Sequence, residues 1–418
     1  MIKTPTLLSL SITGVNIFAR LFHLLVFLLI GNLYGMGDIT DLVFLVYAPL
    51  AVIMSVTAGA ADVIIMPGVH RAEAHNCIPE FLQAIFMRAI VFVFLATLLA
   101  LVISILISDN VASNYVIIAL LAPIPILSCV SSFASNILNA HDRFRQAVLG
   151  PIFGTAGAVL VLFLLPKSSA ALALALFSYE AGSAAGLWFI ARQFISGGAN
   201  NNPDMVRQVT RWAMGGARMQ IVGSLLAALT PMINILFAKS LDPGAVSTVE
   251  YASRLWNLMP LLFTGSLMVF YSQRSRAESR QVPDLGATRA MARNLGMISL
   301  ILSLVAIILA KDIVDSVYSW GKMNNSERTA LAHLLMMYLL GSSAYIAGLV
   351  YVRAISAMGK VHILTLAALL GVILNIAFNA IMIRYFGLSG IGIAASLTNV
   401  AVALFVYNRF VSQSASYS

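Results

Sequence analysis

Apolar stretches long enough to cross a lipid bilayer follow one another along almost the whole sequence, separated by short polar loops. A transmembrane helix needs about 20 mostly apolar residues, and twelve segments meet that requirement. They lie at about residues 6–34, 40–66, 81–108, 114–140, 146–166, 170–194, 210–239, 245–274, 288–310, 328–357, 361–385 and 389–411. Because 60% of the 418 residues are hydrophobic and only 10% are charged, the sequence predicts an all-α polytopic membrane protein.

The basic residues predict the orientation of these spans. With the N-terminus inside, sixteen of the 25 Lys and Arg lie on the cytoplasmic side and six lie outside. By the positive-inside rule this asymmetry places both termini in the cytoplasm. The first apolar run has no small-x-small cleavage site, so we expect a retained span and not a signal peptide. The net charge of +9 comes from short loops and indicates no nucleic-acid partner.

Two parts of the sequence resemble each other and predict two lobes. Residues 135–176 and 352–397 both contain a helix end, a short basic loop, an apolar span, a brief turn and an Ala-rich helix. The copies are six spans apart and therefore have the same orientation, which predicts two six-helix lobes with pseudo-twofold symmetry and a substrate site between them. We assign residues 1–195 to the N-terminal lobe, 196–209 to a cytoplasmic linker and 210–418 to the C-terminal lobe.

Motifs of known enzymes are missing from the sequence. It contains no HExxH, GxSxG, P-loop or CxxC motif, so we expect neither an enzyme nor a bound cofactor or metal. Cys77 and Cys129 are too few for a disulfide framework and are expected to pack as small hydrophobic residues.

Polar residues inside the apolar spans are the informative part, because a charge there costs about 2.5–3.5 kcal/mol and normally faces a bundle interior or a wet cavity. The candidate substrate-binding residues are Asn16, Arg20, Asp41, Glu250, Arg254 and Asn257. One interpretation is structural: Glu250 and Arg254 form an ion pair near an interface, and Arg20 reaches the headgroups. The other is functional: Arg20 and Arg254 converge on a cavity that holds an anionic group, since guanidinium can grip phosphate oxygens in a bidentate manner.

Other polar residues have weaker signals. Arg218 lies near a helix start and is expected to extend to the headgroups. Glu180 lies in the middle of a span, where it either couples transport to protons or cations or bonds to a neighbouring helix. Asn375 and Asn379, one helical turn apart, suit contacts between helices. The segment DIVDSVYSW is expected to lie at the outer interface, with Trp320 as an aromatic anchor.

Several segments resemble the MviN/MurJ-type flippases. Residues 242–277, DPGAVSTVEYASRLWNLMPLLFTGSLMVFYSQRSRA, resemble the eighth-helix motif of that family, in which a Gly-x-Val-Ser turn precedes a Tyr-Ala-x-Arg-Leu helix. SSFASNILNAHDRFRQAVLGPIFG resembles its junction of the fourth and fifth helices, and VRAISAMGKV begins the equivalent in the second lobe. The opening FARLFHLLVFLLIGNLYGMGDITDLVFLVYAPL is also similar, so the resemblance covers nearly the whole chain.

This resemblance implies the fold of the multidrug/oligosaccharidyl-lipid/polysaccharide (MOP) exporters and alternating access of a central cationic cavity. It implies a polyprenyl-pyrophosphate carrier with a saccharide headgroup as cargo, membrane lipids as surroundings, and glycan polymerases or assembly proteins as candidate partners. By matched position, Arg20, Asp41 and Arg254 become cavity residues. The runner-up is a cation-coupled drug antiporter of the same fold, which would need an acidic, aromatic cavity.

The sequence also departs from the family pattern. A second Arg-Asp on the first helix is Val26-Phe27, and a basic pair on the second is Ile53-Met54. The acid of a Glu-Gly-Ala motif is lost at Ala58, although Asp62 lies near and joins Glu180 as a candidate for ion coupling. The acid before Arg254 is Ser253, and two further C-terminal helices usual in flippases of peptidoglycan precursors are not found. These departures favour an undecaprenyl-linked unit of a surface polysaccharide, such as O-antigen or exopolysaccharide, over lipid II.

Overall fold

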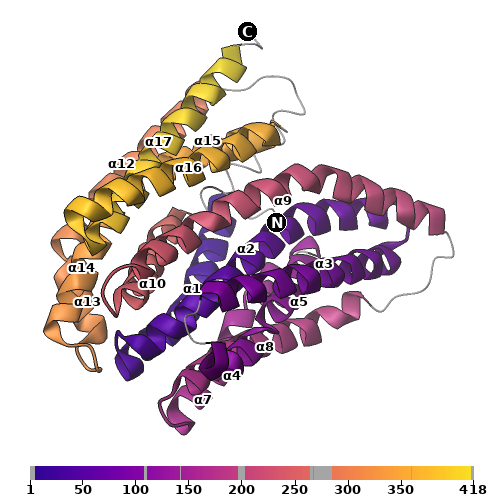
Figure 1. Ribbon diagram of the computed structural model, residues 1–418. Coiled ribbons are helices and arrows are strands. Elements are labelled where there is room, and N and C mark those ends of the chain that lie inside the picture. The colour runs from indigo at the N-terminus through magenta and orange to yellow at the C-terminus, as the bar shows by residue number, and fades with distance from the viewer. Residues whose placement is uncertain are drawn as a thin grey trace. The chain divides into compact units, whose positions relative to one another are not determined.

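The computed structural model describes residues 5–107, 111–141, 143–195, 203–263, 267, 285–358 and 360–415, and every regular element in these ranges is a helix (Figure 1). The first group is α1 (Pro5–Tyr34), α2 (Asp38–Glu73), α3 (Ile78–Ile107), α4 (Val111–Leu121), α5 (Ile124–Ala140), α6 (Phe144–Ala147), α7 (Gly150–Leu164), α8 (Ser169–Ala191) and η1 (Arg192–Phe194). The second group is α9 (Pro203–Lys239), α10 (Ala245–Trp256), α12 (Leu285–Ile308), α13 (Ala310–Tyr318), α14 (Asn325–Leu340), α15 (Ser342–Ala357), α16 (Val361–Phe386) and α17 (Leu388–Ala415).

Among the described residues, nine helices are long and apolar enough to cross a membrane, and the bent pair α14–α15 makes up to ten. These correspond to ten of the predicted spans. The other two contain α1, whose described apolar part is Leu21–Tyr34, and α10. The prediction of an all-helical polytopic membrane protein is confirmed.

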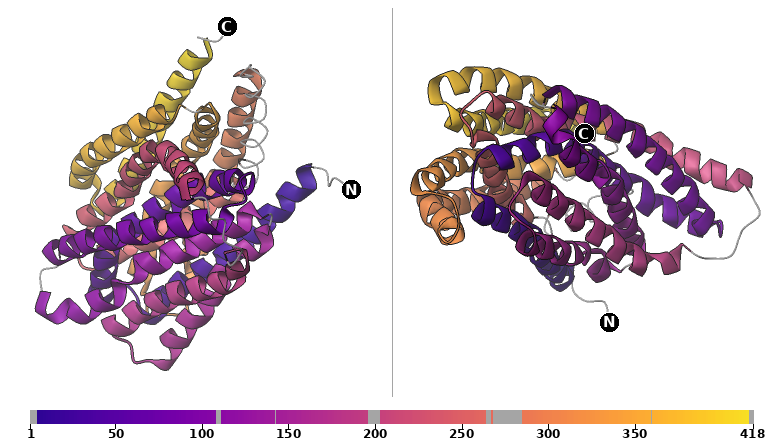
Figure 2. Two further views of the ribbon diagram at one scale, coloured as in Figure 1. Left: turned by 90° about the vertical axis from the view of Figure 1, so that its right-hand side faces the viewer. Right: turned by 60° about the horizontal axis from the view of Figure 1, so that its bottom comes forward.

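The chain divides into two compact units, each of which is described by itself; Figure 2 shows their helices from two further sides. One unit, called unit 2, comprises Phe18–Leu33 and Asp38–Ala228. The other, unit 1, comprises Met1–Ile17, Tyr34–Gly37 and Leu229–Ser418, so the turn between α1 and α2 belongs to unit 1. The division at the linker 196–209 stays a prediction, and residues 196–202 lie outside the described residues.

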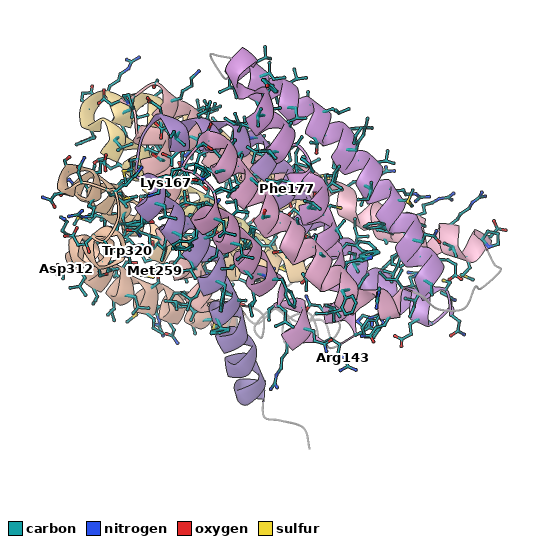
Figure 3. All side chains as sticks on the ribbon, turned by 90° about the horizontal axis from the view of Figure 1, so that it is seen from below. Arg143, Lys167, Phe177, Met259, Asp312 and Trp320 are labelled. Carbon is teal, nitrogen blue, oxygen red and sulfur yellow. The ribbon has the colours of Figure 1, made fainter. Side chains whose placement is uncertain are left out.

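In unit 2, α7 and α8 pack closely because small residues line their contact. A Cβ added to Gly154 would lie 2.4 Å from the carbonyl oxygen of Tyr179, and one added to Gly182 would lie 2.8 Å from that of Phe153. Ser183 donates a hydrogen bond of 2.9 Å to the carbonyl of Gly150 across the same contact. Membrane helices associate in this way because lipid supplies no hydrophobic driving force between them. Arg143 precedes the span formed by α6 and α7, and Lys167 follows it, so the two basic residues lie at its opposite ends (Figure 3).

In unit 1, α14 and α15 meet at a bend of 43° at Gly341. Ser396 of α17 fills the bend: its hydroxyl accepts a 2.9 Å hydrogen bond from the Gly341 amide and donates to the carbonyl of Met337 at 2.5 Å. A Cβ on Gly341 would come within 2.6 Å of the Ser396 Cα. A side chain of the neighbouring helix therefore satisfies the backbone group that the bend exposes, as a broken helix in an apolar environment requires.

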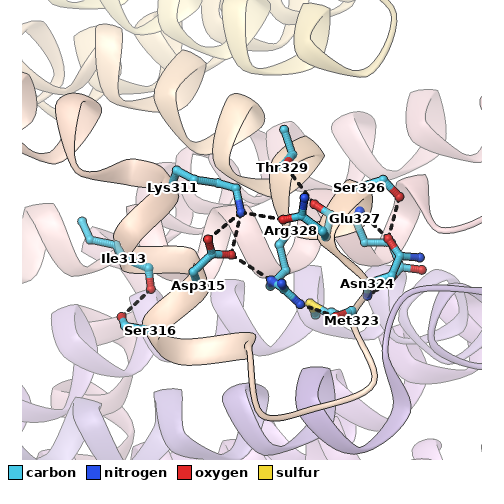
Figure 4. A network of polar contacts seen from close by, with 11 residues as sticks. Lys311, Ile313, Asp315, Ser316, Met323, Asn324, Ser326, Glu327, Arg328 and Thr329 are labelled. Atoms are coloured by element: carbon cyan, nitrogen blue, oxygen red, sulfur yellow. Dashed lines mark hydrogen bonds and ion pairs between the residues drawn. The ribbon is translucent and has the colours of Figure 1, made fainter.

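A polar network fixes the loop between α13 and α14 (Figure 4). Lys311 donates to both carboxylate oxygens of Asp315 at 2.6 Å, and Arg328 donates to the same carboxylate at 2.8 Å. These two cations hold the pKa of Asp315 below its ordinary value, the hydrogen bond from Lys311 having the largest effect. Asn324 and Glu327 form a capping box at the start of α14. Within α13, Val314 and Tyr318 are buried while Asp312 and Ser316 are exposed, so the helix is amphipathic; Trp320, two residues past its end, is 60% exposed.

Candidate functional site

The site begins at the turn before α10, where Gly244 has a φ of +90° that only glycine adopts without strain. The hydroxyl of Thr248 donates to the Gly244 carbonyl at 2.6 Å, and that of Ser247 donates to it at 3.1 Å. One turn on, Tyr251 is fully buried and donates a 3.2 Å hydrogen bond to the carbonyl of Gly35 in the α1–α2 turn. The first turns of α10 are thus anchored to a segment more than 200 residues away in the sequence.

Glu250 and Arg254 face each other one turn apart on α10. The Nε of Arg254 donates to Oε1 of Glu250 at 2.8 Å, and its Nη2 donates to the same oxygen. The Glu250 side chain is 9% exposed and that of Arg254 is 23% exposed. The predicted ion pair therefore exists and is largely removed from solvent, which costs desolvation free energy that only close pairing can offset.

The helix ends directly after this pair. Asn257 is the C-cap residue of α10 and is exposed, and its backbone amide still donates to the Ser253 carbonyl at 2.9 Å. Pro260 explains the end: it has no amide hydrogen to donate to the Trp256 carbonyl four residues earlier. Residues 258–263 are helical again, while Arg274, Arg276 and Arg280 lie outside the described residues.

Aromatic residues enclose the end of α10. The indole Nε1 of Trp256 donates to the hydroxyl of Ser342 at 2.8 Å, and its ring lies 5.2 Å from that of Tyr345 and 6.3 Å from that of Tyr338. The C-terminal end of α10 is therefore packed against aromatic side chains of α14 and α15 within unit 1.

Behind Tyr338, three asparagines join α9 to α16. The Asn379 amide donates to the Asn234 side-chain oxygen at 2.9 Å and to the Asn375 carbonyl at 2.9 Å, while Asn234 donates to the Tyr338 hydroxyl at 3.5 Å. Asn375 and Asn379 are fully buried. Asn379 therefore bonds a neighbouring helix, as predicted, while its bonds to Asn375 lie within α16.

Unit 2 holds the two candidates for ion coupling. Asp62 of α2 is exposed and accepts a 3.0 Å hydrogen bond from the amide of Asn136 on α5. Glu180 of α8 is 8% exposed. Its neighbour Tyr179 packs against the ring of His23 at 4.9 Å. A role for either carboxylate in coupling stays a prediction.

The remaining predicted residues lie on α1, α2 and α9. Asp41 lies in the first turn of α2, where the helix dipole favours a carboxylate. Asn16 and Arg20 belong to α1, and their side chains lie outside the described part, so convergence of Arg20 with Arg254 stays a prediction. Arg218 is exposed on α9. The predicted packing of both cysteines is confirmed, since Cys77 and Cys129 are free and buried.

Sequence reasoning missed Asn136, Asn234 and Ser342 as partners of the candidates. Asn234 could have been found, because it is an amide inside the apolar run 221–238. Over the described residues, no group of three or more His, Cys, Asp or Glu side chains is placed to hold a metal ion.

Comparisons with known proteins support one family. The family described as "Lipid II flippase MurJ" matches residues 30–417. A probable lipid II flippase MurJ from Buchnera aphidicola subsp. Acyrthosiphon pisum (strain APS) is 24% identical over 300 residues, which are 68% of this chain and 57% of that relative. One from Thermotoga maritima is 26% identical over 184 residues, covering 44% of this chain and 38% of the relative. The matches thus span less than two thirds of these relatives.

Solved structures have the same fold. A lipid II flippase MurJ in an inward closed conformation has a TM-score of 0.78 at 16% identity, covering 98% of this chain and 90% of that one. An inward-facing MATE family transporter of the MOP superfamily has a TM-score of 0.76 at 11% identity, covering 96% and 95%. The predicted MOP fold is therefore confirmed. Because the family match extends over nearly the whole chain, this protein belongs to the MurJ family.

Proposed function

We propose that this protein is a flippase that moves a polyprenyl-pyrophosphate-linked saccharide from the inner to the outer leaflet of the bacterial cytoplasmic membrane. The observation that carries the proposal is the Glu250–Arg254 pair, a largely buried cation inside a chain of the MurJ family. Both termini lie in the cytoplasm in this proposal, and no covalent chemistry is involved.

Arg254 binds the pyrophosphate in this proposal, together with Arg20 of α1. Guanidinium suits the task because it stays charged and matches phosphate oxygens with two parallel donors. Glu250 positions Arg254, and Asp41 does the same for Arg20. By reducing the net positive charge, the two carboxylates weaken the grip enough for release. Asn16 and Asn257 extend the polar surface, and Glu180 and Asp62 are the sites of ion coupling.

The cargo is an undecaprenyl-linked unit of a surface polysaccharide. The support is the loss of charged family positions at Val26-Phe27, Ile53-Met54 and Ala58, where the site keeps fewer polar groups for a peptidoglycan precursor. Lipid II is the alternative cargo. Expression in cells depleted of their lipid II flippase separates the two: we expect no rescue, together with loss of a surface polysaccharide when the gene is deleted. Full rescue would assign lipid II.

Translocation by purified protein in vesicles tests the pyrophosphate clamp. We expect Arg254→Ala to abolish transfer of a fluorescent undecaprenyl-pyrophosphate saccharide, and Arg254→Lys to reduce its rate about tenfold, because lysine cannot form the two-donor contact. The matched control is Arg384→Ala, which removes an exposed arginine from the end of α16 and should leave the rate unchanged. Normal transfer by a folded Arg254→Ala protein would refute the clamp.

A drug antiporter is the competing function, since MATE transporters have this fold. It would need an acidic cavity for cationic drugs, whereas the described charges around α10 are a carboxylate paired with an arginine. Ethidium efflux from the same vesicles distinguishes the two functions. We expect no efflux above that of empty vesicles.

A further inference from the structure

The first half of α9 lies outside the membrane-spanning stretch of that helix. The uncharged apolar run of α9 is residues 219–238, while the helix begins at Pro203. Val209, Thr210 and Ala213 are buried, and Val209 and Ala213 belong to an apolar core with residues of α2, α3 and α5. One face of this segment therefore packs against α2, α3 and α5 within unit 2.

The opposite face carries arginines. Arg207, Arg211 and Arg218 are exposed and are separated by four and seven residues, which places them in one stripe along a helix. Trp212, beside the stripe, is 47% exposed. Exposed arginines beside a half-exposed tryptophan are typical of the part of a membrane protein that lies at the water–lipid interface.

Two arginines from other helices extend the stripe. The Cζ of Arg71, near the end of α2, lies 4.5 Å from the centre of the Trp212 ring. Arg88 of α3 donates to the sulfur of Met214 at 3.3 Å. We call the five residues Arg71, Arg88, Arg207, Arg211 and Arg218, together with Trp212, the arginine surface. It draws on three helices of unit 2.

The arginine surface carries an uncompensated positive charge. Its nearest acids along the chain are Glu73, Glu80 and Asp204. Glu73 lies 3.9 Å from His70, and none of the five arginines pairs with a carboxylate within the described part of the chain. The contacts that these arginines do make, to an indole ring and to a thioether, leave their charge in place.

The position of the surface along the helices matches the lipid headgroups. Arg88 is followed by an uncharged run at 89–107, and Arg218 by one at 219–238, each long enough to cross a bilayer. Both arginines thus mark the edge of the hydrocarbon region. Arg71, Arg211 and Trp212 lie just beyond it, with Arg207 farthest out, and tryptophan is enriched at this level.

We propose that the arginine surface binds the headgroups of anionic phospholipids in the leaflet at this end of unit 2. Guanidinium groups form two-donor contacts with phosphate oxygens, and clusters of four to eight basic residues beside a membrane span recognise anionic lipids. A net negative headgroup complements the five unpaired cations, whereas a zwitterionic headgroup brings its own cation. The lipid is a bulk membrane component and not the cargo.

Quenching of Trp212 fluorescence measures which lipid lies beside the surface. The full chain is placed in mixed phosphatidylcholine and phosphatidylglycerol bilayers in which one lipid or the other carries bromine in its acyl chains. The signal of Trp212 is the difference between the parent protein and Trp212→Phe. We expect brominated phosphatidylglycerol to quench Trp212 about twice as strongly as brominated phosphatidylcholine at equal mole fraction. Salt at about 1 M, where the Debye length is about 3 Å, should remove the difference.

Two variants test the arginines. We expect the triple change Arg207→Ala, Arg211→Ala and Arg218→Ala to equalise quenching by the two lipids. The control removes three exposed basic residues elsewhere, Lys167, Lys322 and Arg384, and should keep the preference. If the first triple variant does not fold, Arg211→Ala alone should reduce, without removing, the difference in quenching between the two lipids.

Three outcomes would overturn the proposal. Equal quenching by both lipids in the parent protein would exclude a preference for anionic headgroups. Loss of the preference in the control variant as well would assign it to net charge and not to this surface. Displacement of phosphatidylglycerol by substoichiometric undecaprenyl pyrophosphate would show that the surface receives the cargo.

Discussion

The arginines of the two units have contrasting surroundings. Arg254 in unit 1 is 23% exposed and paired with Glu250, whereas Arg207, Arg211 and Arg218 in unit 2 are exposed and have no carboxylate partner in the described part of the chain. A largely buried cation needs a partner to offset its desolvation, and an exposed one needs none because water solvates it. An arginine with a carboxylate partner is thus part of the folded core, whereas an exposed arginine without one is free to bind groups outside the protein.

Removing the partner of the buried arginine should have the largest effect. We expect Glu250→Ala to lower the free energy of unfolding by about 3–5 kcal/mol, because it leaves the Arg254 charge desolvated and unpaired. Thermal unfolding in detergent measures this loss. Arg211→Ala, the exposed counterpart, should change stability by less than about 0.5 kcal/mol. The contrast would fail if the two variants unfolded at the same temperature.

A smaller effect is expected where a partly exposed arginine, Arg71, contacts an aromatic ring. Trp212→Leu removes the cation–π contact with Arg71 and should cost about 0.5–1 kcal/mol. Trp320→Leu is the control, since Trp320 is 60% exposed and has no cation–π contact among the described residues. The two melting temperatures in detergent give the comparison. A larger loss in the Trp320 variant would indicate that lost surface area, and not the contact, sets the cost.

The Lys311–Asp315–Arg328 network tests the intermediate case, in which the carboxylate is paired but, at 37% exposed, less buried than Glu250. The folded protein holds the pKa of Asp315 below its ordinary 3.8, so it binds this proton less readily than the unfolded chain does. The contribution to stability is therefore full above about pH 4 and is lost as the pH falls through the lower folded value. We expect a small drop in melting temperature at acidic pH that is reduced in Asp315→Asn. An equal drop in both proteins would assign it to other carboxylates.

Local signals predicted much of this site, and long-range contacts could not be predicted. The spacing of Glu250 and Arg254 gave their ion pair, because residues four apart meet on a helix. The helix end at Trp256 is also predictable locally, because Pro260 has no amide hydrogen to donate to the Trp256 carbonyl. By contrast, the bond from Asn379 to Asn234 joins residues 145 positions apart, and no periodicity in one sequence specifies that partner.

The fold class followed from the lengths of the apolar runs and from the family resemblance, and both are confirmed. The bend at Gly341 was not predicted, because the apolar pattern continues through it. What stabilises the bend is Ser396 on another helix, and its contribution depends on tertiary packing. The helices themselves are thus encoded locally, while this bend depends on a residue of another helix.

The α1–α2 turn limits where this protein can be joined to a relative in a chimera. Its residues Tyr34–Gly37 belong to unit 1, where Gly35 accepts the Tyr251 hydrogen bond and lies against Lys322, while the helices on both sides of the turn contribute to unit 2. Neither unit is therefore a contiguous module. A chimera that exchanges the first half of the chain with that of a relative also exchanges a part of the other unit, and will fold well only when α10 and the donated turn are matched.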